Sequence, residues 1–163
     1  MKINARYLPK ILTRKDRVLQ SKMLTKSRSL YKKGKYFTRK AVSSFKSKKS
    51  PHIIKAMKIY KVDKIGATDE LSRKTGCSKS ALGKIINKGQ GAYYSSGSRP
   101  NQTGQSWGLA RLASSITGGK AAAVDYNILE SGCKPNSKAL TMAKRAKRMF
   151  GHGTRKVAKV TMK

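Results

Sequence analysis

The residues of this chain that could do acid–base or metal chemistry are few and scattered. The two histidines, His52 and His152, stand far apart, and only six aspartates and glutamates occur among 163 residues. No spacing of His, Cys, Asp or Glu matches a metal site, and no nucleophile has an evident base. Asp69 and Glu70 are explained as stabilisers of a helix's first turn. The sequence therefore predicts a non-enzymatic protein with no catalytic residue, no metal, no cofactor and no small-molecule substrate.

Cationic side chains are the abundant chemistry, and they are unevenly distributed. Residues 1–66 hold 21 lysines and arginines against two acids, residues 67–137 hold nine against four, and residues 138–163 hold nine against none. A chain with a net charge of +33 repels itself unless an anionic surface neutralises it. We expect contacts to a polyanion or an acidic partner from Arg14, Arg17, Lys22, Lys32, Lys33, Lys46, Lys48, Lys49, Arg145 and Arg148.

The segment 68–88 predicts two short helices joined by a turn at Gly76, an arrangement that resembles a helix-turn-helix. The apolar seam between these helices would be made by Leu71, Cys77, Leu82 and Ile85. The residues that would face a DNA groove are Lys79, Ser80 and Lys84. A tight corner with only a packing role needs the same glycine and the same seam, so the two interpretations stay open.

The stretch 88–107 is rich in glycine, aromatic and turn-forming residues. Gly89 is expected to end the preceding helix, and residues 90–104 are expected to form turns. Tyr93, Tyr94 and Trp107 could stack on bases or cover a small core, and we expect Trp107 to be buried. The arginines best suited to a specific contact are Arg99 and Arg111, because they stand apart from the basic arms.

The elements that must position these residues are helical, so the predicted fold class is all-α, with a small helical core, a helix-turn-helix-like corner and extended basic arms. Helices are expected over 13–33, 51–60, 68–75, 78–88, 105–117, 121–131 and 137–150, with residues 35–50 extended or irregular. The first helix has only a thin apolar stripe, so docking on a partner would stabilise it. The core is expected to include Leu71, Leu82, Ile85, Trp107, Leu112, Ile116 and Phe150.

Three regions follow from this distribution: a basic arm over 1–63, a helical core domain over 64–150, and a basic C-terminal tail over 151–163. We expect the core domain to fold alone and the arm not to. The two cysteines, Cys77 and Cys133, have no companion of the Cys-x-x-Cys type, so buried thiols are favoured over a disulfide. No run of about 18 apolar residues is present, which argues against a transmembrane helix.

The central stretch 86–129 resembles an uncharacterised domain family of large double-stranded DNA viruses, including algal giant viruses, and of tailed phages. The resemblance is carried by the GAY element at Gly91–Tyr93, the loop Ser95–Pro100, Trp107 with Ala110 and Arg111, and Asp125. The basic segment 30–50 resembles what precedes the domain in algal-virus members, so that the likeness covers residues 13–145.

The resemblance implies a viral protein, and together with the charge it leads to two hypotheses. The first is a virion structural protein: a basic, internal minor capsid component beneath the outer capsid shell, made in the host cytoplasm or nucleus. Its partners would be acidic faces of capsid proteins, or anionic lipid of an inner membrane. The alternative is a nucleic-acid-binding protein that condenses or packages the genome, contacting DNA without sequence preference.

Overall fold

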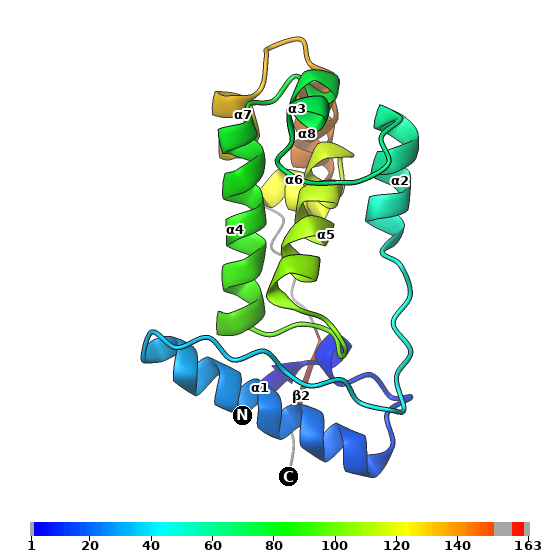
Figure 1. Ribbon diagram of the computed structural model, residues 1–163, viewed down its shortest axis with the longest axis vertical. Helices are drawn as coiled ribbons and strands as arrows, with labels where there is room; N and C mark the ends of the chain where they lie inside the picture. The colour runs from blue at the N-terminus through cyan, green and yellow to red at the C-terminus, as the bar shows by residue number, and fades with distance from the viewer. Residues whose placement is uncertain (1, 152–157, 162–163) are drawn as a thin grey trace. The chain divides into compact units, whose positions relative to one another are not determined.

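The computed structural model describes residues 2–151 and 158–161, and the described chain is predominantly helical. In chain order the elements are β1 (Lys2–Asn4), the 3-10 helix η1 (Ala5–Tyr7), α1 (Arg14–Lys32), α2 (Pro51–Tyr60), α3 (Asp69–Thr75), α4 (Lys79–Ser95), α5 (Gly104–Ile116), α6 (Lys120–Val124), α7 (Tyr126–Gly132), α8 (Lys138–Phe150) and β2 (Lys159–Thr161) (Figure 1). The all-α expectation is confirmed.

The helix boundaries reflect local chemistry that the sequence carries. Thr13, Thr68 and Ser137 each cap a helix by accepting a hydrogen bond from the backbone N–H three residues later. Gly76 ends α3 in the left-handed conformation, with a φ of 75°. These starts and stops agree with the predicted ones.

The chain divides into two compact units whose segments alternate along the sequence. Unit 1 comprises residues 1–48, 90–107 and 156–163, and unit 2 comprises residues 49–89 and 108–155. The division differs from the expected regions 1–63, 64–150 and 151–163, because residues 90–107 associate with the N-terminal segment and α2 associates with the other helices.

Unit 1 has its own small core, which the sequence analysis did not anticipate. Its buried apolar residues are Ile3, Leu8, Leu12, Met23, Leu24 and Val42. Gly97, with a φ of 114°, allows this packing, because a Cβ there would lie 2.8 Å from a methyl carbon of Leu24. The segment 35–48 is irregular, as predicted, and follows α1 (Figure 1).

The buried face of α1 agrees only in part with the apolar stripe that the sequence predicts from Leu19, Met23, Leu30 and Tyr31. Met23 is buried and Leu19 and Tyr31 are exposed, while the other buried residues of the helix are Asp16, Gln20, Leu24 and Ser27. Polar groups can occupy this face because other parts of unit 1 supply hydrogen-bond partners, which a pattern of apolar spacing cannot reveal. A short antiparallel sheet, also unexpected, pairs Ile3 of β1 with Val160 of β2.

Unit 2 contains the larger core, built from helices α2 to α8. Leu71, Leu82, Ile85, Leu112 and Ile116 are fully buried in it, as expected. Its alanine-lined face comes from α8, where Ala139, Ala143 and Ala146 are buried. The Tyr60 hydroxyl donates to the carbonyl of Ile116, and burial raises the pKa of this tyrosine. The core therefore includes α2, which the expected core domain left out.

Two predicted core residues occupy other positions. Trp107 is only half-buried and belongs to unit 1, where its ring meets Tyr7 edge-on at 6.3 Å. Phe150 is partly buried at the margin of the unit 2 core, since it is the last residue of α8. Apolar character alone did not distinguish these edge positions from the centre.

The expected end of α4 at Gly89 is wrong, because the helix continues to Ser95. A Cβ on Gly89 would lie 2.6 Å from Cα of Gly108, so this glycine permits the close approach of α4 and α5. Figure 1 shows the two helices running side by side here. Residues 90–95 are consequently helical rather than turn-forming.

The single helix expected over 121–131 is two helices, α6 and α7, that separate at Asp125. This residue departs from helical geometry, with φ −96° and ψ 17°. Its backbone still links the helices, because its N–H donates to the carbonyl of Ala121 and its carbonyl accepts from Ile128. The break coincides with a buried polar contact of the Asp125 side chain.

Candidate functional site

The helices α3 and α4 begin where the sequence predicts and are joined by the predicted turn at Gly76. The Ser78 hydroxyl accepts from the N–H of Ala81 and so caps α4, while the Ser72 hydroxyl donates to the carbonyl of Cys77 across the turn. A Cβ on Gly76 would lie 2.7 Å from Cβ of Ser137, so the turn itself is tightly packed. The corner is therefore fixed by its contacts within unit 2.

The three predicted groove-facing residues, Lys79, Ser80 and Lys84, are all exposed on α4. Lys79 is already paired: its Nζ lies 2.9 Å from Oδ1 of Asp69, and this contact lowers the pKa of the Asp69 carboxyl. Both partners are largely exposed, so water and salt weaken their attraction. Lys79 can exchange this partner for an external anion at little cost.

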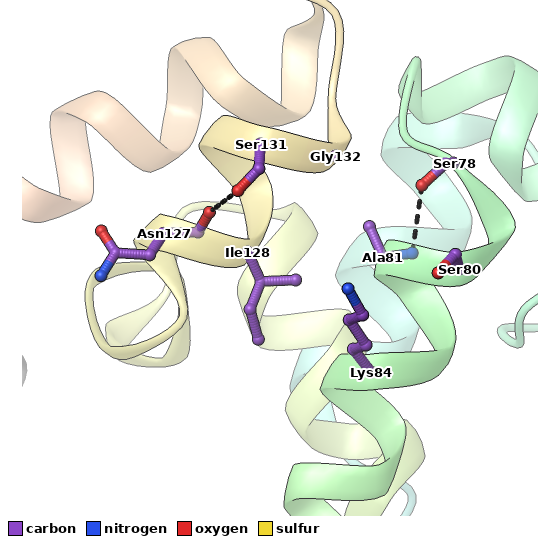
Figure 2. A pocket seen from close by; sticks show the side chains of 8 residues that line it. All are labelled: Ser78, Ser80, Ala81, Lys84, Asn127, Ile128, Ser131 and Gly132. Atoms are coloured by element: carbon purple, nitrogen blue, oxygen red, sulfur yellow. Dashed lines mark hydrogen bonds between the residues drawn. The ribbon is translucent and has the colours of Figure 1, made fainter.

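Helix α7 flanks the exposed face of α4. A Cβ on Gly132 would lie 2.3 Å from Cβ of Ala81, and the shallow pocket beside this contact is lined by Ser80, Lys84 and Ile128. Figure 2 shows Lys84 and Ile128 on facing sides of the hollow. The lining offers the Lys84 ammonium group, serine hydroxyls and one amide, that of Asn127, which points away from Lys84 in Figure 2, and it contains no arginine. This surface suits an anionic group better than a base sequence.

Cys77 and Cys133 form a disulfide, which corrects the expectation of two buried thiols. Backbone pairing brings their turns together: Ser78 N–H donates to the Gly132 carbonyl, and Lys134 N–H donates to the Gly76 carbonyl. The cysteines are 56 residues apart in sequence. No spacing rule relates such distant residues, so only the packing of the α3–α4 turn on the α7–α8 turn reveals the bond.

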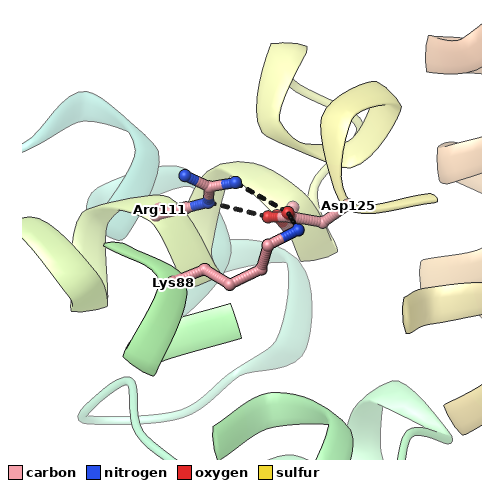
Figure 3. A network of polar contacts seen from close by, with 4 residues as sticks. Lys88, Arg111 and Asp125 are labelled. Atoms are coloured by element: carbon pink, nitrogen blue, oxygen red, sulfur yellow. Dashed lines mark hydrogen bonds and ion pairs between the residues drawn. The ribbon is translucent and has the colours of Figure 1, made fainter. Parts of the chain in front are cut away.

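Arg111 makes the specific contact expected of it, but with a group inside the protein. Its guanidinium donates to both carboxylate oxygens of Asp125, at 2.9 and 2.7 Å, and the Asp125 side chain is fully buried. Ser115 donates a third hydrogen bond, and Nζ of the half-exposed Lys88 lies 3.4 Å from Oδ1 (Figure 3). This network joins α4, α5 and the α6–α7 break, and a bidentate buried pair of this kind fixes geometry.

The other candidate for a specific contact, Arg99, is exposed in the loop after α4. The deeply buried arginine of unit 1 is instead Arg39, which the sequence analysis did not single out. Its guanidinium donates to the Ser27 and Ser98 hydroxyls and to the Tyr93 carbonyl, and lies 3.8 Å from the centre of the Tyr93 ring. Burial lowers the pKa of Arg39. No carboxylate takes part in these contacts.

Tyr93 and Tyr94, both candidates for stacking, differ in their availability. Tyr93 is fully buried, and its hydroxyl donates to the Gln102 carbonyl while it accepts from the N–H of Arg39. Tyr94 is half-buried and touches Tyr36. Of the three predicted stacking residues, Tyr94 alone combines partial exposure with exposed aromatic neighbours.

The only acid of unit 1 is Asp16, and it is buried. It accepts hydrogen bonds from the Ser44 hydroxyl and backbone N–H and from the Ser43 hydroxyl, and these bonds lower the pKa of its carboxyl. The carboxylate thereby fixes the segment 35–48 to the start of α1. It offers no negative charge to the surface of the unit.

Almost all the predicted polyanion contacts are exposed. Arg17 is the exception, because it is half-buried and donates to the Leu8 carbonyl at 3.3 Å. The exposed residues in unit 1 are Arg14, Lys22, Lys32, Lys33, Lys46 and Lys48, and those in unit 2 are Lys49, Arg145 and Arg148. The structure leaves these charges facing solvent.

Residues 2–151 and 158–161 bring together no group of three metal-binding side chains. Of the two histidines, His52 is the second residue of α2, whereas His152 lies outside the described residues. Within the same part of the chain, no helix is both long and apolar enough to cross a bilayer.

The model of a protein family of unknown function, DUF5824, matches residues 5–150. This match includes α1 through α8 and thus most of both units. Neither a curated protein nor a solved structure matches the chain at a significant level.

Proposed function

The chain belongs to the DUF5824 family of unknown function, and from that premise we propose that it is a non-enzymatic structural protein held in place by extended acidic surfaces. In the setting that the sequence resemblance suggests, it is a basic, internal minor capsid component of a large double-stranded DNA virus. It would lie beneath the outer shell, against acidic faces of capsid proteins or the inner membrane.

One observation carries this proposal: the surface charge of unit 1 is of a single sign. The unit holds 20 lysines and arginines against one acid, and that acid, Asp16, is buried. Self-repulsion of such a surface is relieved only by anions from outside the unit.

A regular assembly provides anions of the required kind. Repeated acidic patches at fixed positions can hold every copy in one arrangement, and exposed lysines need only come close to carboxylates, because an ammonium group acts as a point charge. Many weak pairs formed together offset the entropic cost of holding each lysine side chain in one place.

Fractionation of purified virus particles tests the location. Gentle disruption at physiological salt, followed by separation of shell from nucleoprotein, should leave the protein with the shell, and raised salt should release it because exposed ion pairs are screened. Quantitative recovery with the genome at physiological salt would contradict the capsid proposal.

A second candidate function, genome condensation, is favoured by the exposed Lys79, Ser80 and Lys84 on the helix pair. Under it, Lys79→Ala and Lys84→Ala would weaken binding to every duplex equally, since lysines at these positions meet phosphates. Under base reading, the same substitutions would instead relax a sequence preference. We expect the uniform loss.

A further inference from the structure

Three tyrosines of unit 1 adjoin one another at the surface. The Tyr36 ring lies 6.2 Å from the Tyr31 ring and 5.1 Å from the Tyr94 ring, measured between ring centres, and both contacts are tilted by 56°. Tyr31 comes from the last turn of α1, Tyr36 from the irregular segment after it, and Tyr94 from the end of α4. Residues distant in sequence therefore build one aromatic surface.

This surface is open to solvent, and that requires an explanation. Tyr36 is 72% exposed and Tyr31 is 37% exposed. Single apolar residues at a surface are ordinary, but adjoining large rings commonly mark a place where something binds. The tyrosines have free ring area that the folded chain itself does not use.

The charges around the rings are all positive. Lys32, Lys33 and Lys35 lie within four residues of Tyr31 and Tyr36 and are exposed. Nζ of Lys26 lies 4.6 Å from the centre of the Phe37 ring, which extends the cationic and aromatic surface by one more pair. The single acid of the unit accepts hydrogen bonds from Ser43 and Ser44, so no carboxylate of unit 1 competes for these lysines.

Hydrogen bonds between α1 and the end of α4 support this aromatic surface. The Ser27 hydroxyl donates to the Tyr94 carbonyl, and the Arg28 guanidinium donates to the Ser96 carbonyl at 2.8 Å, which ties α1 to the end of α4. Tyr93, buried under the surface, meets Tyr94 edge-on at 4.9 Å. The helix ends that carry Tyr31 and Tyr94 are thus held together before any ligand arrives, which lowers the entropic cost of binding.

We propose that Tyr31, Tyr36 and Tyr94, with Lys32, Lys33 and Lys35, form a binding platform for single-stranded nucleic acid. Exposed rings stack on unpaired bases, and neighbouring lysines meet the phosphates between them. Duplex bases already stack on one another and cannot use the rings, while an acidic protein surface needs the lysines only. This site goes beyond the proposed capsid role and does not depend on it.

Fluorescence anisotropy of the full-length protein with a labelled 20-nucleotide oligothymidine and a 20-base-pair duplex tests the site. Tyr36→Ala should weaken binding to the single strand by roughly tenfold, within the range for loss of one stacked base, and leave duplex binding unchanged. Tyr36→Trp should retain or improve single-strand affinity, because it keeps a flat ring.

Lys35→Ala is the matched control for charge. It should weaken binding to both the single strand and the duplex. It should also reduce the slope of log affinity against log salt concentration for the single strand by about 0.7, whereas Tyr36→Ala should leave that slope unchanged. Because Tyr36 is highly exposed, Tyr36→Ala should leave the fold intact, and an unaltered thermal midpoint checks this.

Equal binding of oligothymidine by the wild type and Tyr36→Ala would overturn the proposal. A Tyr36→Ala loss of the same size on duplex and single strand would also overturn it, because it would show that the ring does not contact unpaired bases. Binding of Tyr36→Trp as weak as that of Tyr36→Ala would exclude stacking as the cause.

Discussion

At the scale of single residues, the acids of this chain differ in environment, because some are buried in hydrogen-bond networks and others are exposed. Asp125 and Asp16 are buried and each accepts several hydrogen bonds, whereas Asp69 is exposed and pairs with Lys79 across the helix corner. In a chain of net charge +33, the buried acids anchor cationic or hydroxyl-bearing segments, and they therefore contribute to stability rather than to the surface potential.

Asp125→Asn should destabilise the protein strongly. The substitution keeps the shape but leaves Arg111 facing a neutral amide, and loss of one partner of a buried pair costs about 3–5 kcal/mol in the free energy of unfolding. Urea denaturation followed by circular dichroism measures this effect. Asp69→Asn, the control at an exposed pair, should leave the denaturation midpoint nearly unchanged, and equal effects at both sites would contradict the structural role of Asp125.

Asp16 should make the stability of unit 1 depend on acid pH. Because the Ser44 and Ser43 hydrogen bonds lower its folded-state pKa below the usual 3.8, they stabilise the folded form above that pH. This stabilisation is lost as the pH falls through the folded pKa. Ser44→Ala should move the Asp16 pKa, measured by NMR titration of its carboxyl carbon, back towards 3.8. An unmoved pKa would show that Ser44 is not its main partner.

At the scale of elements, small residues decide how closely the helices approach. Gly89 and Gly108 meet where α4 and α5 cross, and Gly132 lets α7 lie against Ala81 of α4. The disulfide joins the α3–α4 turn to the α7–α8 turn. Together these contacts hold α4 to both of its neighbours.

Gly89→Ala should therefore destabilise the protein, against the usual preference of helices for alanine. The new Cβ would lie 2.6 Å from Cα of Gly108, and such overpacking typically costs about 1–3 kcal/mol. Gly83→Ala is the control within the same helix, because its Cβ would have 4.0 Å to the nearest side-chain atom. Gly83→Ala should increase the free energy of unfolding by roughly 0.5–1 kcal/mol and so raise the thermal midpoint. Effects of one sign at both glycines would argue against the crossing.

Reduction of the disulfide should lower the thermal midpoint of unit 2 without abolishing its helices. A bond that closes a loop of this length typically contributes about 2–4 kcal/mol, mainly by restricting the unfolded chain. Thermal melts with and without a phosphine reductant measure the difference. The double variant Cys77→Ser/Cys133→Ser should melt like the reduced protein and be insensitive to reductant; a further shift on its reduction would indicate another cause.

At the scale of the whole molecule, the two units are built from interleaved segments. Residues 1–48 obtain Tyr93, Ser98 and Asn101 from the segment 90–107, and the Asn101 amide exchanges hydrogen bonds with the backbone of Val42. The core of unit 2 obtains Ala56 and Tyr60 from α2. Neither unit is one continuous stretch of sequence.

Fragments that omit a segment of a unit should therefore lose the cooperative unfolding of that unit. Residues 1–63 alone should lack a cooperative helix melt, because Ser98 and Asn101, which bond to Arg39 and Val42, are missing from them. A fragment of residues 49–150 should melt cooperatively and at a higher temperature than residues 64–150, which lack the buried Tyr60. Circular dichroism of the three fragments measures this, and a strong cooperative transition in residues 1–63 would contradict the interdependence.

The sequence by itself determined the helical class, most helix starts and stops, and the cationic character of the surface. Caps such as Thr68 and Ser137 and the glycine stop at Gly76 act through hydrogen bonds and torsion angles a few residues away, so local sequence contains them. The exposure of Lys79, Ser80 and Lys84 followed from helical periodicity for the same reason.

Tertiary structure decided what depends on residues far apart in the chain. Gly89 lies within its helix and allows Gly108 to pack against it, and Cys77 forms a disulfide with Cys133, 56 residues away. Arg39 is buried, with Ser27, Tyr93 and Ser98 as its hydrogen-bond partners. The aromatic surface of Tyr31, Tyr36 and Tyr94 likewise exists only where α1 meets the end of α4. Close packing and the pairing of buried polar groups act between residues that are neighbours in space, and a single sequence does not show which distant residues become neighbours.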